Sequence, residues 1–313
     1  MKKIIAMLLV LTMVLPLAAC AAGSDDNDVK TVTPGKLTVA LSPDFAPMEF
    51  VDPTKEGQDK YVGFDVSLAK FIADELGLEL VIMPMSFEAC QTAVYAGTVD
   101  MSISGYSWTE KREQNYNISD YYHAGDNEDE QVLITLASNG DKYATAEALA
   151  GAKIGAQNAS LQQDLATEQL PDSELILFTD LGTAVMQLKN GDFDCIAVAD
   201  GNADAIIAAN PEVAKSGFNF FVDEKLTGNV ILLQKGNDEL TQLVNNILKK
   251  AEMYYESWYA DAKATAGIDV SFDDEGNEIT EPAEGETTAP ADTTAPADTT
   301  APADTTAPAE EGE

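Results

Sequence analysis

Apolar residues follow two alternating periods along the middle of the chain. The segment KLTVAL, at residues 36–41, alternates as a short strand does. Residues 62–76 carry apolar side chains at helical spacing, and Gly77 follows as a helix end. The pattern then predicts a strand at 78–83, a helix at 87–95 and a strand at 99–103. This order is β-α-β-α-β.

A second series of the same kind begins beyond residue 145. It predicts helices at 146–149, 160–168 and 183–189, and strands at 153–156, 174–178 and 195–199. Two such series imply an α/β fold of two doubly wound lobes, joined by a two-strand hinge with a ligand cleft between them. We expect lobe 1 at 36–124 and 226–268, and lobe 2 at 125–225.

The first residues of the chain have the pattern of an export signal. Two lysines precede a short apolar stretch at residues 4–15, which is too short to span a bilayer. The sequence LAAC that ends at Cys20 resembles a bacterial lipobox, which implies a signal peptide at 1–19 and a lipid anchor on Cys20. An ordinary secretory signal cut after Ala19 or Ala22 is the alternative. Residues 20–35 are small, polar and acidic, as in a flexible tether.

Residues 273–313 differ in composition from the rest of the chain. They carry acidic residues but no basic ones, and residues 287–310 repeat TTAPAD three times before TTAPAE. Threonine, proline and alanine repeats cannot form a core, so we expect an extended, disordered tail. The threonine hydroxyls could instead carry glycans.

Charge and cysteine content exclude several functions. The 18 basic and 54 acidic residues give a net charge of −36, which makes nucleic acid an implausible partner. Beyond Cys20 the only cysteines are Cys90 and Cys195, and His123 is the only histidine. No zinc spacing is present, so we expect no metal site and no cofactor. We expect the two cysteines to be buried free thiols, with a disulfide as the alternative.

Five segments fall in the order and spacing of a known family. They are FAPMEF at 45–50, YVGFDVSLAKFIADELG at 61–77, ISGYSWTEKRE at 103–113, ISDYY at 118–122 and GDFDCIAVAD at 191–200. Together they resemble the amino-acid-binding branch of the extracellular solute-binding proteins of ABC importers. The resemblance implies the type II periplasmic-binding-protein fold, a free amino acid as ligand, an ABC importer permease as partner, and a monomer without enzymatic activity.

The ligand implied by this family needs a cation for its carboxylate. Arg112 is the only arginine among the 18 basic residues, and its planar guanidinium can bind a carboxylate through two parallel hydrogen bonds. In the family, the arginine at this point of the motif binds the ligand carboxylate. An exposed arginine in an ordinary salt bridge is the alternative.

The resemblance also assigns groups around Arg112. Ser104, Gly105 and Ser107 hold the positions where the family presents backbone carbonyls to the ammonium and a hydroxyl and N–H to the carboxylate. Asp200 follows a predicted apolar strand, where it would pair with the ligand ammonium or simply cap a helix.

Lobe 2 and two aromatic rings complete the expected site. Ser160 begins a predicted helix whose free backbone N–H groups suit a carboxylate, and Gln157 lies just before it, within reach of the ligand side chain. Phe45 and Phe87 match family positions whose rings flank the ligand, although either ring could belong to the core.

One position bears on specificity. Many relatives that bind cationic amino acids have an aspartate where this chain has Ser42. Its absence favours a neutral polar or aromatic amino acid, including cystine. Asp44 and Glu49 lie nearby in the sequence but need not face the ligand.

Two other functions deserve comparison. An enzyme on this scaffold needs a general acid or base in the cleft. The only histidine, His123, lies beside an acidic segment, and we expect no separate catalytic domain. A surface receptor or adhesin is suggested by the repeat tail alone. Gene deletion that abolishes amino-acid uptake would favour the importer component over both.

Overall fold

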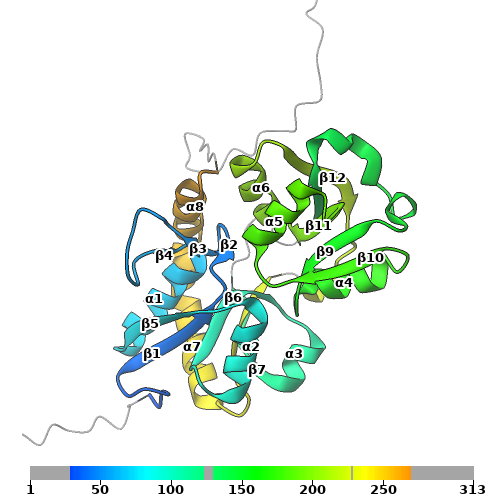
Figure 1. The fold of residues 1–313 in the computed structure, drawn as a ribbon. Helices are drawn as coiled ribbons and strands as arrows, with labels where there is room; N and C mark the ends of the chain where they lie inside the picture. The colour runs from blue at the N-terminus through cyan, green and yellow to red at the C-terminus, as the bar shows by residue number, and fades with distance from the viewer. Residues whose placement is uncertain (1–28, 123–129, 227, 269–313) are drawn as a thin grey trace, which may run out of the picture. The chain divides into compact units, whose positions relative to one another are not determined.

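The computed structural model describes residues 29–122, 130–226 and 228–268, which form two five-stranded sheets and a small third one (Figure 1). The first sheet has the order β5-β1-β6-β13-β7. Its strands are β5 (Glu79–Pro84), β1 (Lys36–Leu41), β6 (Met101–Ser107), β13 (Asn229–Gln234) and β7 (Tyr116–Ile118). β1 is parallel to β5 and β6, whereas β13 is antiparallel to β6 and β7.

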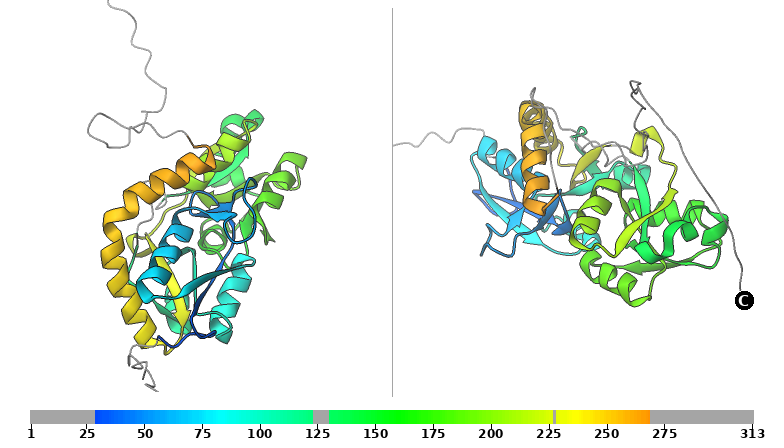
Figure 2. Two further views of the ribbon diagram at one scale, coloured as in Figure 1. Left: turned by 90° about the vertical axis from the view of Figure 1, so that its left-hand side faces the viewer. Right: turned by 90° about the horizontal axis from the view of Figure 1, so that it is seen from above.

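Both faces of the first sheet are covered, because successive side chains of a strand point to opposite faces. In β13, Ile231 and Leu233 join one core cluster, and Val230 and Leu232 join the other. The helices of the first cluster are α1 (Phe64–Leu76), α7 (Asp238–Ala251) and α8 (Tyr255–Ala266). The second cluster contains α2 (Phe87–Ala96). Figure 2 shows α7 and α8, in yellow and orange, along one flank of this sheet.

The second sheet has the order β10-β9-β11-β8-β12. Its strands are β10 (Glu174–Phe178), β9 (Lys153–Gln157), β11 (Cys195–Ala199), β8 (Gln131–Leu136) and β12 (Val213–Asn219). β9 is parallel to β10 and β11, and β8 is antiparallel to β11 and β12. The helices α5 (Leu181–Asn190) and α6 (Asp200–Ala209) cover one face, and α4 (Leu161–Gln169) covers the other.

Three short strands form a hairpin sheet beside the first sheet. They are β2 (Asp44–Phe45), β3 (Glu49–Val51) and β4 (Tyr61–Val62). Gly63 follows β4 with φ +119°, and a Cβ there would lie 2.3 Å from the carbonyl oxygen of Met48. Only glycine allows this approach, which brings the start of α1 against Glu49.

The remaining described elements are short. They are the helix α3 (Glu110–Asn115) and the 3₁₀ turns at Ala137–Tyr143, Glu147–Leu149, Glu224–Leu226 and Glu252–Tyr254. Several helix starts are capped as the sequence suggests. Thr109, Ser160 and Asp180 accept hydrogen bonds from the backbone N–H groups of Arg112, Gln163 and Thr183.

The chain crosses between the two large sheets twice. It leaves the first after β7 and returns from β12 to β13. The two crossings meet at a bridge between Tyr122 and Asn229, where the Tyr122 N–H donates to the Asn229 carbonyl at 2.9 Å. This pairing is the expected two-strand hinge.

The expectation of an α/β fold with two lobes is confirmed, although both large sheets are mixed rather than purely parallel. The strands predicted at 36–41, 174–178 and 195–199 have the predicted bounds. Cys90 and Cys195 are free and buried, as expected. The signal peptide, Cys20, His123 and the repeat tail lie outside the described residues.

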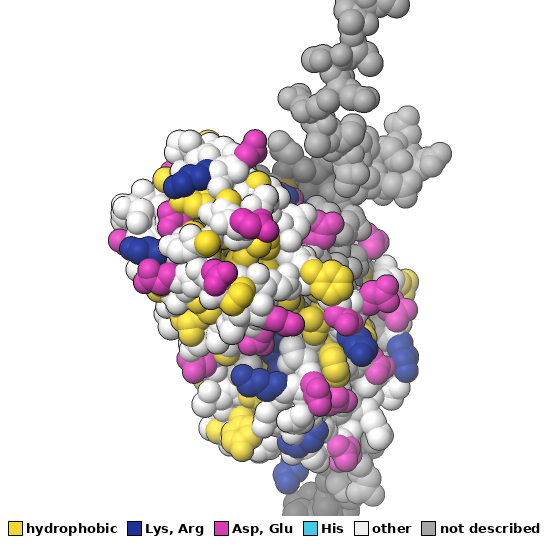
Figure 3. Space-filling model, turned by 90° about the vertical axis from the view of Figure 1, so that its right-hand side faces the viewer, with side chains coloured by type: hydrophobic (Ala, Val, Ile, Leu, Met, Phe, Trp, Pro, Cys, Tyr) yellow, Lys and Arg dark blue, Asp and Glu magenta, His cyan; other side chains and the backbone are white. Residues whose placement is uncertain are grey.

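The described surface can be examined on one face. Figure 3 shows acidic, basic and apolar side chains interspersed there rather than gathered by sign. Within the described ranges, no helix is long and apolar enough to cross a membrane.

Candidate functional site

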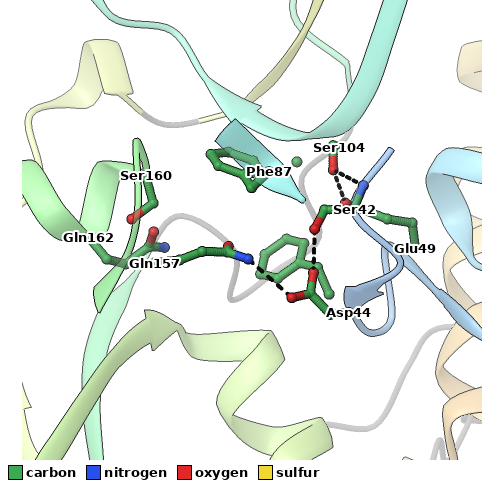
Figure 4. Close-up of a pocket in the computed structure, with 10 residues that line it drawn as sticks. Ser42, Asp44, Glu49, Phe87, Ser104, Gln157, Ser160 and Gln162 are labelled. Atoms are coloured by element: carbon green, nitrogen blue, oxygen red, sulfur yellow. Dashed lines mark hydrogen bonds between the residues drawn. The ribbon is translucent and has the colours of Figure 1, made fainter. Parts of the chain in front are cut away.

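A pocket lies between the two large sheets, at the carboxyl ends of β1, β6 and β9 (Figure 4). This is where open α/β sheets bind ligands. It surrounds about 290 Å³ of empty space, part of which opens to solvent. Its lining residues are Ser42, Asp44, Phe45, Glu49, Phe87, Ser104, Gly105, Gln157, Ser160 and Gln162. Seven of the ten predicted ligand-binding residues are among them.

The two predicted aromatic residues form apolar walls of this pocket. The ring of Phe45 lies against Gly105, where a Cβ would meet the Phe45 Cε1 at 2.6 Å. Gly105 has φ +57°, so both its backbone conformation and this contact require glycine. The ring of Phe87 packs on Tyr106 with 4.8 Å between ring centroids.

Arg112 is buried beside the pocket, with 5% of its surface exposed. Its Nη1 donates to the Ser107 carbonyl at 2.7 Å, and its Nη2 donates to the Ala159 carbonyl of lobe 2 at 3.0 Å. Its Cζ lies 5.7 Å from the centroid of the Phe87 ring. The described residues give this guanidinium carbonyl acceptors and no carboxylate within ion-pair distance. Its alternative role in a surface salt bridge is therefore not what the structure shows.

Polar residues at the ends of β1 and β6 form a connected chain of hydrogen bonds. The Ser42 N–H donates to Ser104 Oγ at 3.0 Å, and that hydroxyl donates to Glu49 Oε1 at 2.5 Å. Ser42 Oγ in turn donates to Asp44 Oδ1 at 2.8 Å. Ser107 contributes its carbonyl to Arg112 and does not line the pocket.

Asp200 lies away from the pocket lining. It is the first residue of α6, and its Oδ1 pairs with Lys215 Nζ at 2.7 Å. The same ammonium reaches Asp204 at 2.8 Å. The carboxylate predicted to receive the ligand ammonium thus already has a cationic partner from β12.

Asp44 is a pocket residue to which the sequence analysis gave no role. Its Oδ2 accepts hydrogen bonds from Gln157 Nε2 at 3.1 Å and from the Leu181 N–H at 2.9 Å. Leu181 is the first residue of α5, so the Asp44 carboxylate of lobe 1 contacts a helix N-terminus of lobe 2. Burial raises the pKa of Asp44, and the hydrogen bonds from the Leu181 N–H and the Ser42 hydroxyl partly offset this rise.

Other hydrogen bonds also join the two lobes. Asn202 Nδ2 donates to the Ala46 carbonyl at 2.9 Å, and Asn158 Nδ2 donates to Glu88 Oε2 at 2.6 Å. Gln91 Nε2 donates to the Ala159 carbonyl at 3.2 Å. The lobes are therefore in direct polar contact on several sides of the pocket.

Glu49 is the second pocket carboxyl group that was given no role, and it is fully buried. Behind it lies Asp65 of α1, also fully buried. The two carboxyl groups influence each other's pKa, and the burial of both favours a proton on at least one of them. Burial raises the pKa of Asp65 to about 7, and burial together with the charge of Asp65 raises the pKa of Glu49 well above its usual range.

The sequence of residues 37–261 matches family 3 of the bacterial extracellular solute-binding proteins. The chain belongs to this family. It is therefore an extracellular solute-binding protein rather than an enzyme.

Individual relatives carry more specific descriptions. The probable histidine-binding protein of Campylobacter jejuni is 29% identical over 266 residues, which cover 81% of this chain and 100% of the relative. The arginine-binding extracellular protein ArtP of Bacillus subtilis is 28% identical over 259 residues, 80% of this chain and 93% of the relative.

A solved structure confirms the type II periplasmic-binding-protein fold. The amino acid ABC transporter substrate-binding protein AbpA of Streptococcus pneumoniae, bound to L-arginine, has a TM-score of 0.68 and 32% identity. The match covers 74% of this chain and 96% of AbpA.

We predict that raising the pH from about 4 to about 7 destabilises the ligand-free protein through Asp65. In this window the folded state keeps a proton that the unfolded state, with an ordinary Asp pKa of 3.8, has lost. The free energy of unfolding therefore falls as pH rises. Asp65→Asn should reduce this slope by up to about one proton, measured by urea denaturation at several pH values.

Asp100→Asn provides the matched control for this measurement. Asp100 is also buried in lobe 1 and accepts the Val32 and Thr38 N–H groups at the opposite end of β6. An Asp65→Asn slope equal to that of the wild type would contradict the assignment.

Proposed function

We propose that this chain is the substrate-binding component of an ABC importer and captures a free cationic L-amino acid by closure of its lobes. One observation carries the proposal: a buried guanidinium, which has no carboxylate partner among the residues that the structure describes, lies beside a pocket lined by two carboxyl groups. A zwitterion with a further positive charge complements both. Burial without such a partner costs several kcal/mol for each charge.

The ligand carboxylate is assigned to Arg112 and to the N-terminus of α4. Arg112 contacts Phe87 and the Ala159 carbonyl, and Ser160 lines the pocket as the cap of α4. A guanidinium and free backbone N–H groups both favour an anion. Ser107 belongs to this end of the site because its carbonyl fixes one edge of the guanidinium.

The ligand ammonium is assigned to the Ser104–Gly105 end of β6. Both residues line the pocket, and glycine leaves the backbone accessible there. Asp200 remains a predicted partner of the ligand ammonium. To bind the ligand, it must first give up its ion pair with Lys215.

The ligand side chain is assigned to the Asp44 side of the pocket. The expectation of a neutral ligand rested on Ser42, but Ser42 donates to Asp44, which supplies a carboxylate at nearly the same place. Ser42 and Asp44 also line a neighbouring open cavity of about 310 Å³, which can admit a long side chain. Gln157 and Gln162 add polar groups. The arginine- and histidine-binding relatives support a cationic ligand.

Lobe closure couples binding to transport. Groups from both lobes line the pocket, so a ligand that contacts both has greater affinity for the closed state and shifts the population toward it. The closed shape is then presented to the permease. A lipid anchor on Cys20 would keep the protein beside that permease.

A thermal-shift panel of the proteinogenic amino acids and cystine tests the proposal. Arginine, lysine or histidine should give the largest rise in melting temperature, about 5–10 °C at about 100 times the dissociation constant. A larger rise with a neutral amino acid would overturn the cationic assignment. No rise with any would overturn amino-acid binding itself.

Arg112→Lys should weaken L-arginine binding by at least about tenfold, because lysine cannot form two parallel hydrogen bonds to a carboxylate. Isothermal calorimetry measures the change. The neighbouring Lys111→Ala, at an exposed position of the same helix, is the control and should bind as the wild type does. Unchanged affinity in Arg112→Lys would remove Arg112 from the site.

Asp44→Asn should lower the affinity for L-arginine by about tenfold more than the affinity for L-glutamine. Both ligands lose the interlobe hydrogen bonds of Asp44 equally, so the ratio isolates the lost charge. Competition calorimetry gives this ratio, with the exposed Asp59→Asn as control. An unchanged ratio would mean that Asp44 only holds the lobes together.

A further inference from the structure

The Glu49–Asp65 pair is built by the backbone rather than by chance proximity. Gly63 allows α1 to start directly against β3, and the Asp65 N–H donates to the Met48 carbonyl at 2.8 Å. Both carboxyl groups are 0% exposed. Two ionised carboxylates at this depth would repel each other strongly, so the pair is stable only when it holds at least one proton.

The hydrogen bonds around the pair decide which oxygens remain for that proton. Ser104 donates to Glu49 Oε1, and the Gly105 N–H and Tyr122 hydroxyl donate to Asp65 Oδ2 at 2.9 and 3.0 Å. Glu49 Oε2 and Asp65 Oδ1 are buried and receive no hydrogen bond from the described residues. These two oxygens are left to share the proton.

No cation among the described residues acts on the pair. The titratable groups that influence it are Asp44 in the hairpin sheet, Tyr106 in β6, Tyr122 at the hinge and Tyr255 in α8. Burial raises the pKa of each of the three tyrosines above its ordinary value, so they stay neutral near pH 7. Within the described ranges the pair therefore has no positive partner, although Glu49 forms part of the pocket wall.

Asp65 also connects the pocket to the hinge. Gly105 lines the pocket, and Tyr122 forms the bridge to Asn229 where the chain crosses between lobes. One carboxylate oxygen accepts from both. A change in the charge of Asp65 is thus transmitted to the strand end that faces the ligand.

We propose that Asp65 is a positioning residue for ligand recognition. Together with Glu49 it forms a proton-sharing acid pair. This pair releases its proton to solvent when the positive charge of the ligand reaches the pocket wall at Glu49. The inference rests on the proposed function. No bond between heavy atoms changes. One O–H bond of the pair breaks, the proton leaves to buffer, and the ligand cation replaces its charge.

The direction of the pH dependence follows from this exchange. The pKa of Asp65 is about 7 in the ligand-free protein, and a nearby cation lowers it. Below about pH 7 the ligand must displace a proton, so affinity falls as pH falls, by up to about tenfold per pH unit.

Isothermal calorimetry with L-arginine near pH 6.5 tests the exchange, because the arginine side chain does not titrate there and that of histidine does. Titrations in buffers of different ionisation enthalpy count the protons released. The wild type should release up to about one proton per arginine. Asp65→Asn keeps an acceptor for Gly105 and Tyr122, and should release almost none while its affinity becomes nearly independent of pH.

Further variants separate the pair from its neighbours. Glu49→Gln should lose the release as Asp65→Asn does, and it decides the question if Asp65→Asn does not fold. The buried Asp100→Asn should keep the release. Loss of the release in Asp44→Asn with retention in Asp65→Asn would assign the proton to Asp44 and overturn the inference.

The two proposals fail in different ways. If wild-type protein does not bind arginine, the proposed cationic ligand is wrong and the inference falls with it. If it binds arginine with the same enthalpy in every buffer, the proposed function stands and the proton exchange is overturned.

Discussion

The site depends on how charge is buried where the two lobes meet. Arg112 is almost fully buried with only carbonyl acceptors, and Glu49 and Asp65 are fully buried without a cation among the described residues. Water is largely removed from these groups, and burial of unpaired charge is costly. Such an arrangement is best satisfied by a molecule that carries both signs.

Lobe contact follows from the same constraint. Arg112 of lobe 1 donates to Ala159 of lobe 2, and Asp44 of lobe 1 accepts from Leu181 of lobe 2. Each of these two side chains thus has a backbone hydrogen-bond partner on the opposite lobe. Opening the lobes would expose both groups to water, which also solvates them well. The closed state becomes more stable than the open state only when a ligand supplies a full opposite charge, which backbone dipoles do not supply.

The sequence predicted the elements whose partners are near in the chain. The strands at 36–41, 174–178 and 195–199 show clear periodicity. β8, β12 and β13 were not predicted, although β8 and β13 are short apolar runs. Their antiparallel pairing with distant strands is what local periodicity does not show. Seven predicted site residues meet at one pocket, since they follow strand ends. Asp200 also follows a strand end, but Lys215 reaches it from β12, a contact set only by the register of that strand.

Asp44 and Glu49 show why ligand class was harder to predict than the site itself. Their side chains face the pocket because a hairpin sheet and the close approach at Gly63 turn them inward. Ser42 itself carries no charge, but its hydroxyl donates to Asp44, so a carboxyl group lies beside this position all the same. A charge can thus lie at the same point of a pocket although a different position in the sequence supplies it. In the proposed proton exchange, the charge of the Glu49–Asp65 pair also depends on the charge of the bound ligand.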